Sequence, residues 1–210
     1  MLEREALNSA EIQADDEGIL IDLDSEEDYQ RAIKGIMPPF PTRKQCQEIL
    51  REHRTPQPVL EHVQAVAGIA CAIAEYLNSR GYRLHLGIVM AASMLHDIAK
   101  GEKEHTSKGS QLVARLGYPE VAAVIGSHMI LAPEHRNQIS ETSIVYLADK
   151  LVIGRRPVSL DEKLESRLKG FDEEAARQGA RERIGQAMAL QKQIESILGL
   201  KIEDILKENR

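Results

Sequence analysis

The chain has 210 residues and a formal net charge of −6 at pH 7, so it is long enough for one domain with a hydrophobic core and some additional segments. The acidic balance, an aromatic content of 3% and the lack of tryptophan argue against nucleic-acid binding and against attraction to anionic membranes. The two cysteines, Cys46 and Cys71, have no short paired spacing, which disfavours disulfides and thiolate zinc sites and fits a reducing cytoplasm. The acidic first residues lack the pattern of a signal peptide, and the apolar run from Leu86 is too short to span a bilayer.

The first 41 residues are expected to form a separate strand–helix segment. Residues 1–17 are polar and acidic, residues 18–24 predict a strand, and Ser25 is expected to cap a short helix that runs to Lys34. The prolines at residues 38–41 predict a stiff linker, because proline ends helices. We assign this segment no catalytic role.

The rest of the chain predicts helices. Thr42 and Gln45 have the pattern of a capping box for a helix to about residue 53, and Pro56 and Pro58 start the next helix, which runs to about residue 79. Gly199 is a natural helix stop, and a short amphipathic tail follows it. Further helices are expected at about residues 86–100, 105–116, 119–129, 141–153, 159–169 and 172–198.

The helix expected from residue 86 is the most informative part of the sequence. Up to Leu95 only Gly87 and Ser93 are not hydrophobic, and a helix that is apolar on all sides is a buried helix. His96 and Asp97 follow directly, although an aspartate is almost never fully buried unless it is paired. We therefore expect this helix to deliver ligands to a metal ion.

Other helices carry histidine or aspartate on faces that are predicted to point into the core. His62, His105 and His128 share their helical faces with apolar residues, and Asp149 lies on a helix that is apolar nearly all round. A single such histidine is more often a satisfied core residue, and Asp149 with Lys150 could be a pair on the helix surface. Several inward-facing residues on separate helices would each need a partner, however, and a shared divalent cation satisfies them together.

Imidazole and carboxylate ligands without thiolate suit iron, manganese, zinc, nickel or magnesium. Six ligands are too many for one ion with an open coordination position, so two ions with a bridging aspartate fit better; without His105 and His128, the other four residues would hold one ion. The remaining histidines, at positions 53, 85 and 135, lie among charged or loop residues and are expected to be exposed. The candidate ligands are His62, His96, Asp97, His105, His128 and Asp149.

At these residues the chain resembles the HD-domain superfamily of metal-dependent phosphohydrolases. The ordered pattern of that family is a histidine, a His-Asp pair and a distant aspartate, and it matches LEHV at His62, LHDIAK at residues 95–100 and YLADK at Asp149. The resemblance covers about residues 42–170 and implies an all-α HD-domain helical bundle that holds one or two divalent metal ions. His105 and His128 resemble the extra histidines of two-metal members, some of which carry a second histidine where this chain has Met129.

The sequence GILIDLDSEEDY at residues 18–29 is similar to the closing strand and helix of molybdenum-cofactor-type or sugar-nucleotide nucleotidyltransferases, whose glycine-rich start is absent here. Residues 1–41 are therefore interpreted as an appendage, either a remnant of such a domain or an ordinary acidic segment. An unpaired strand could pair with its copy in a second chain, which leaves a homodimer open. Residues 42–170 are expected to be the HD domain, and residues 171–210 a long helix and tail that pack on it.

The resemblance implies that a metal-activated water hydrolyses a phosphate ester, since a divalent ion lowers the pKa of its bound water. Asp97 is the expected bridging carboxylate and Lys100 the expected phosphate contact, although a cation at a helix C-terminus explains Lys100 nearly as well. Arg155 and Arg156 could contact a polyanionic substrate, but solvated surface arginines are the commoner case. The expected partner is a small phosphorylated molecule, with nucleotides first, and the expected localisation is cytoplasmic.

Two other functions stay open at this point. The chain could be a non-catalytic metal- or ligand-binding regulatory HD module, or a structural helical adaptor that uses residues 172–198 as a dimerisation arm. Metal content separates the adaptor from the other two functions. Turnover of phosphate esters separates the enzyme from the binding module, because a fold does not fix a function.

Overall fold

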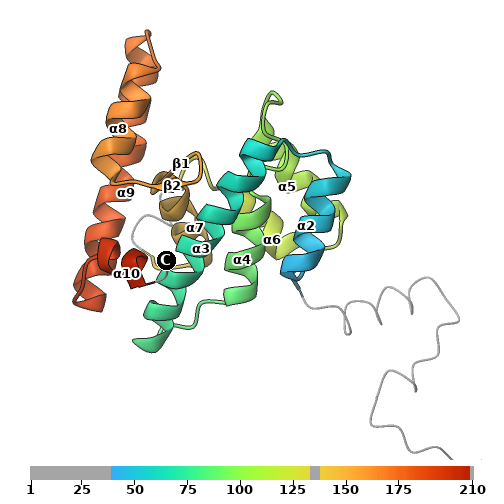
Figure 1. Cartoon of the computed structure of the whole chain (residues 1–210), viewed down its shortest axis with the longest axis horizontal. Coiled ribbons are helices and arrows are strands. Elements are labelled where there is room, and N and C mark those ends of the chain that lie inside the picture. Colours follow the sequence, from blue (N-terminus) through green and yellow to red (C-terminus); the bar gives the residue numbers. More distant parts are fainter. Residues whose placement is uncertain (1–38, 133–137, 209–210) are drawn as a thin grey trace, which may run out of the picture. The chain divides into compact units, whose positions relative to one another are not determined.

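The computed structural model describes residues 39–132 and 138–208, and this part of the chain contains nine helices and one small β-hairpin (Figure 1). The predicted all-α fold class is confirmed. The strand and helix expected before residue 38, and their resemblance to a nucleotidyltransferase, lie outside the described residues. The helices are α2 (Arg43–Glu52), α3 (Gln57–Ser79), α4 (Leu86–Leu95), α5 (His105–Arg115), α6 (Pro119–Gly126), α7 (Glu141–Lys150), α8 (Leu160–Lys169), α9 (Glu174–Leu198) and α10 (Ile202–Glu208).

Several helix ends follow from their capping residues. The Thr42 hydroxyl accepts a hydrogen bond from the Gln45 backbone N–H at 3.3 Å, and the Gln45 side chain accepts one from the Thr42 N–H at 2.8 Å. This is the predicted capping box of α2. The Ser159 hydroxyl caps α8 by accepting a hydrogen bond from the Glu162 N–H, without the reciprocal bond. Helix α9 ends at Gly199, whose φ of 73° is the left-handed conformation that favours glycine.

Helix α4 lies at the centre of the bundle. It packs against α3, α6, α2 and α7, so most of its side chains are buried, although Leu86 at its start is exposed. Val89, Met94 and Leu95 are fully buried, and burying a side chain of this size stabilises the fold by about 1.5–3 kcal/mol. The all-round apolarity of this helix in the sequence is therefore explained by its central position.

Three predicted helices end earlier than expected. The α4 helix stops at Leu95, and residues 96–100 form turns in which the Ile98 N–H donates to the Leu95 carbonyl and the Lys100 N–H to the Asp97 carbonyl. The α6 helix ends at Gly126 instead of residue 129. His96, Asp97 and His128 therefore lie outside regular helix. The sequence predicted longer helices because its apolar periodicity continues beyond the last helical hydrogen bond.

The third correction concerns residues 151–157. The α7 helix ends at Lys150, and strand β1 (Val152–Ile153) pairs antiparallel with β2 (Arg156–Pro157). Gly154 turns the chain with a φ of 58°, which glycine adopts without strain. Short apolar runs do not distinguish helix from strand, so periodicity alone extended α7 too far.

The C-terminal helices pack on the bundle. Helix α9 contacts α8, α7 and α3, and its apolar stripe is buried within the same chain, so this stripe is not free to act as a dimerisation arm. The Tyr146 hydroxyl donates to the Arg183 carbonyl at 2.7 Å, and the Arg80 guanidinium donates to the Leu198 carbonyl at 2.8 Å. The domain boundaries near residues 41 and 170 stay predictions. No helix among the described residues is long and apolar enough to cross a membrane.

A pair of glycine substitutions tests the packing around α4. A Cβ at Gly87 would overlap the ring of Phe40, with Cδ2 only 2.6 Å away, whereas a Cβ at Gly68 in α3 would meet nothing within 4 Å. We expect Gly87→Ala to lower the free energy of unfolding by about 1–3 kcal/mol through overpacking. Gly68→Ala should raise it by about 0.5–1 kcal/mol, because alanine favours a helix interior. Urea denaturation measures both, and equal shifts would contradict the expectation.

Candidate metal centre

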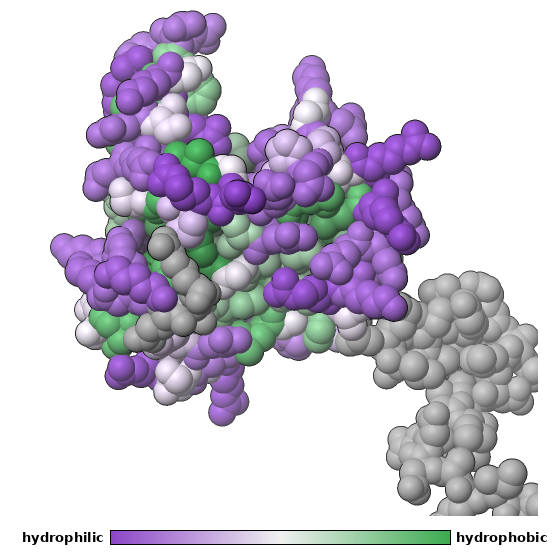
Figure 2. Space-filling view, in the orientation of Figure 1, coloured by the Kyte–Doolittle hydropathy of each residue, from purple (hydrophilic) through white to green (hydrophobic). Residues whose placement is uncertain are grey.

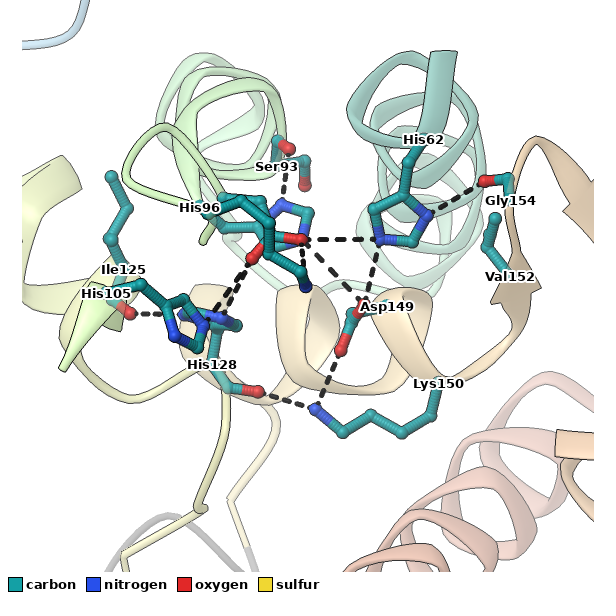
Figure 3. A network of polar contacts seen from close by, with 12 residues as sticks. His62, Ser93, His96, His105, Ile125, His128, Asp149, Lys150, Val152 and Gly154 are labelled. Carbon is teal, nitrogen blue, oxygen red and sulfur yellow. Dashed lines mark hydrogen bonds and ion pairs between the residues drawn. The ribbon is translucent and has the colours of Figure 1, made fainter. Parts of the chain in front are cut away.

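Six polar side chains converge at one end of the bundle from five separate segments (Figure 3). His96, Asp97 and His128 are buried, Asp149 is 7% exposed, and His62 and His105 are partly exposed. The structure thus brings together every residue that was predicted as a metal ligand; their role as ligands stays a prediction. The contributions are His62 from the start of α3, His96 and Asp97 from the turn after α4, His105 from the first position of α5, His128 from the segment after α6, and Asp149 from the end of α7.

Asp97 lies between two groups of ligands. Its Oδ2 is 3.5 Å from His96 Nε2 and 3.9 Å from His62 Nε2. Its Oδ1 is 3.7 Å from the Nε2 atoms of both His105 and His128. These distances are too long for good hydrogen bonds, so each carboxylate oxygen faces a pair of imidazole nitrogens without bonding to them.

Asp149 completes the first group. Its Oδ1 is 3.1 Å from His62 Nε2 and 3.8 Å from His96 Nε2. We call His62, His96 and Asp149 the first half-site, and His105 with His128 the second half-site. Asp97 offers one oxygen to each half-site, which is the arrangement of a carboxylate that can bridge two ions.

Backbone carbonyl groups fix the orientation of three imidazole rings. His96 Nδ1 donates to the Ser93 carbonyl at 2.8 Å, His128 Nδ1 donates to the Ile125 carbonyl at 2.7 Å, and His62 Nδ1 donates to the Gly154 carbonyl at 2.9 Å. A carbonyl oxygen can only accept, so the hydrogen sits on Nδ1 and the lone pair on Nε2. Each lone pair then points into the centre, as in histidines that bind a metal.

Buried atoms without partners provide the test of whether these residues fit a metal. The Nε2 atoms of His96, His105 and His128 and the Oδ1 atom of Asp97 are buried and have no hydrogen-bond partner. Such atoms cost about 1–3 kcal/mol each when they are left unsatisfied. All of them can act as lone-pair donors to a cation, so divalent ions would satisfy them together, and the residues fit a metal.

The protonation states favour metal binding. Burial lowers the pKa of His96, and burial together with the neighbouring His96 lowers the pKa of His128 to about 3, so both imidazoles are neutral at pH 7. Burial opposes the ionisation of Asp149, but the neighbouring Lys150 ammonium holds its pKa well below the ordinary value. Burial likewise opposes the ionisation of Asp97, but the Lys100 ammonium acts against burial through its charge and its hydrogen bond, and the pKa of Asp97 is lowered.

Two buried lysines support the centre, and the sequence analysis missed both roles. Lys150 Nζ donates to the His128 carbonyl at 2.6 Å and to Asp149 Oδ2 at 2.9 Å, so it links the two half-sites (Figure 3). Lys163 Nζ donates to the backbone carbonyls of Asp149, at 3.0 Å, and Val152. The alternative of a surface pair at Asp149 and Lys150 is wrong, because both residues are buried.

The sequence contained a signal for only one of these lysines. The α7 helix is apolar nearly all round, which indicates that Lys150, next to Asp149, is buried in the core as well. The α8 helix is mostly polar and Figure 2 shows mainly hydrophilic side chains over it, so nothing distinguished Lys163 from its solvated neighbours.

The basic residues that were predicted to contact the substrate, Lys100, Arg155 and Arg156, are more exposed than the candidate ligands. Lys100 Nζ donates to Asp97 Oδ2 at 2.7 Å, and its side chain is 45% exposed. Arg156 is exposed and forms an ion pair with Glu162, and Arg155 is exposed as well. His53 and His85 are exposed as expected, whereas His135 lies outside the described residues.

A cavity of about 590 Å³ opens onto the centre, and we call it the main cavity. Its size is within the range of small-molecule sites. At one end it is lined by His62, Asp97, Lys100, His105, His128 and Asp149. Its other walls combine apolar residues, namely Pro58, Val59, Met129, Val152, Ile153 and Phe171, with the polar residues Lys163, Ser166 and Arg167. The arrangement can therefore hold a small molecule that places a polar group at the ligands and an apolar part on the walls.

Comparison with known proteins agrees with the resemblance to the HD-domain superfamily. Residues 59–153 match the family described as HD domain, and this range includes all six candidate ligands. An uncharacterised protein of Methanocaldococcus jannaschii is 30% identical over 130 residues, which cover 52% of this chain and 77% of that protein. No solved structure matches the chain significantly.

Metal content tests the two half-sites. We expect about two equivalents of divalent metal per chain in protein purified without a histidine tag, since Asp97 serves two half-sites. His128→Ala should remove one equivalent and leave the other, because His128 belongs only to the second half-site. His53→Ala, an exposed histidine outside the centre, is the matched control. Elemental analysis measures all three proteins, and equal content in His128→Ala and wild type would show that the second half-site binds no metal.

A second test concerns Lys150. Lys150→Met keeps the length of the side chain but removes the hydrogen bonds that orient Asp149 and the His128 backbone. We expect its metal affinity to fall about 10–100-fold, as for other residues that orient metal ligands. Competition with a chelator measures the affinity. Lys108→Met, which removes an exposed lysine paired with Glu102, should keep the wild-type affinity; an equal loss in both variants would argue against an orienting role.

Proposed function

This chain belongs to the HD-domain family, and from that premise we propose that it is a phosphohydrolase that cleaves a phosphate ester of a small molecule at a divalent metal centre. HD domains are generally metal-dependent phosphohydrolases that bind divalent metals, and the cluster of histidines and aspartates in this chain supports the same chemistry. The observation that carries the proposal is the buried Asp97 carboxylate, with one oxygen facing the imidazole nitrogens of each half-site, among which those of His96, His105 and His128 have no hydrogen-bond partner.

The ligand roles follow from the two half-sites. His62, His96 and Asp149 would hold one ion, His105 and His128 would hold a second, and Asp97 would contact both. Bound there, a divalent ion supplies water of lowered pKa near neutral pH and positive charge against a phosphoryl oxygen.

The residues around the metal centre bind and orient the substrate. Asp97 and Asp149 stay ionised, so the centre keeps its negative charge and its ligand geometry at neutral pH. The Lys100 ammonium lies at the edge of the main cavity on a flexible stem and can donate to a phosphate oxygen in addition to Asp97. The apolar walls of the main cavity, among them Val152 and Phe171, exclude water and contact the organic part of the substrate.

The proposed substrates are small phosphorylated molecules, with nucleotides as the first to be tested. A cavity of about 590 Å³ with apolar walls and a cationic edge suits a ligand that combines a ring with a phosphate. A short phosphate ester without an organic group would leave the apolar walls in contact with water.

The test of the proposal is Asp97→Ala. Removing the shared carboxylate should abolish bound metal and lower phosphatase activity by more than about a hundredfold, because even residues that only orient ligands reach that effect. Activity is measured on a panel of phosphomonoesters and nucleotides with added manganese or iron, and circular dichroism checks the fold. Asp161→Ala, an exposed aspartate of α8, is the control. Full activity in Asp97→Ala would refute the proposal.

A further inference from the structure

A second cavity, of about 90 Å³, lies beside the metal centre and is lined by residues of α7, α8 and α9. Four of its side chains are cationic, namely Lys150, Lys163, Arg167 and Arg183, and only Asp149 is anionic. We call it the basic cavity. It shares Asp149, Lys163 and Arg167 with the main cavity, so the two spaces adjoin.

The two arginines of the basic cavity lack acidic partners. On α9, Arg177 and Arg181 form ion pairs with Glu174 at 3.6 and 2.7 Å. In the part of the chain that the structure describes, no carboxylate forms an ion pair with Arg167 or Arg183. A cationic group that lines a cavity without a counter-ion is available for an anionic ligand.

Gly179 leaves room for the guanidinium of Arg183. A Cβ at Gly179 would lie 3.1 Å from Arg183 Nη1, so the guanidinium packs along α9 over the glycine one turn earlier. Any larger side chain at this position would push the guanidinium away. Arg183 is half-buried and lines the cavity.

The cations also repel one another. The side chains of Lys150, Lys163, Arg167 and Arg183 all line the same space of about 90 Å³. Bound divalent ions at the neighbouring centre would add further positive charge. An anion in the basic cavity offsets this repulsion, which supports the geometric argument.

We propose that the basic cavity binds a phosphate group of the substrate, distinct from the phosphate that is hydrolysed at the metal centre. This inference rests on the proposed function. The fork of a guanidinium matches the geometry of phosphate oxygens, and the volume of about 90 Å³ holds several waters and hence a tetrahedral oxyanion. The substrate class is then a molecule with two phosphate groups, such as a nucleoside diphosphate, in preference to a simple monoester.

The first experiment uses the whole chain after treatment with a chelator and inorganic phosphate as the probe. Titration calorimetry should detect binding to the wild type, and Arg183→Met should weaken it about tenfold, since it removes a charge-assisted hydrogen bond but keeps the apolar stem. Arg183→Lys should retain part of the affinity. Arg181→Met, on the same helix but paired with Glu174, is the matched control. The absence of phosphate binding, or an equal loss in Arg181→Met, would overturn the proposal.

The second experiment uses the metal-loaded chain and compares the Kd values of nonhydrolysable phosphonate analogues of a nucleoside monophosphate and a nucleoside diphosphate, in which methylene groups replace the ester oxygen and, in the diphosphate, also the bridging oxygen. The wild type should prefer the diphosphate analogue, and Arg183→Met should reduce this preference about tenfold. An unchanged preference would show that the cavity takes a free anion and would overturn the assignment to the substrate. Both readouts are binding constants, so a failure of the proposed hydrolysis, seen as no turnover of any ester, is distinguished from a failure of this inference.

Discussion

The structure depends on the burial of one carboxylate, that of Asp97, at the end of the most apolar helix of the bundle. A charge in such a place is tolerated only if the surrounding groups compensate it. Five segments provide that compensation, and backbone carbonyl groups orient the rings of His62, His96 and His128. The histidines are neutral and offer lone pairs, so they leave room for cations and do not themselves neutralise the aspartate.

Two buried lysines hold the charged and backbone groups around the metal centre in place. Lys150 neutralises Asp149 and holds the backbone that carries His128, and Lys163 holds the backbone of Asp149. Because Lys163 comes from α8 and the Tyr146 hydroxyl bonds to the backbone of α9, the C-terminal helices are connected to the metal centre and not merely placed beside it. The same helices bring the arginines that make the neighbouring cavity basic.

Much of the fold could be predicted from the sequence, because the capping residues Thr42, Ser159 and Gly199 act locally and the apolar pattern of α4 is unambiguous. The six converging residues could be predicted from their helical faces together with the family pattern. The hairpin after α7 could not, since two short apolar strands have no periodicity of their own. The position of Lys163 could not either, because it depends on how α8 docks on α7, which no local pattern encodes. The role of each ligand, the substrate and the segment before residue 39 stay predictions.

The turn at Gly154 restricts insertions and deletions in the hairpin between β1 and β2. Its carbonyl sets the ring of His62, which lies 92 positions earlier in the chain. Adding or deleting one residue in that two-residue turn would rotate the carbonyl away and release the imidazole, even though the turn is exposed and remote from the core. Surface turns usually accommodate insertions, but this one is constrained by the histidine it orients. Insertions in this domain should therefore be tolerated more readily elsewhere, such as between α3 and α4 at residues 80–83, than in the hairpin.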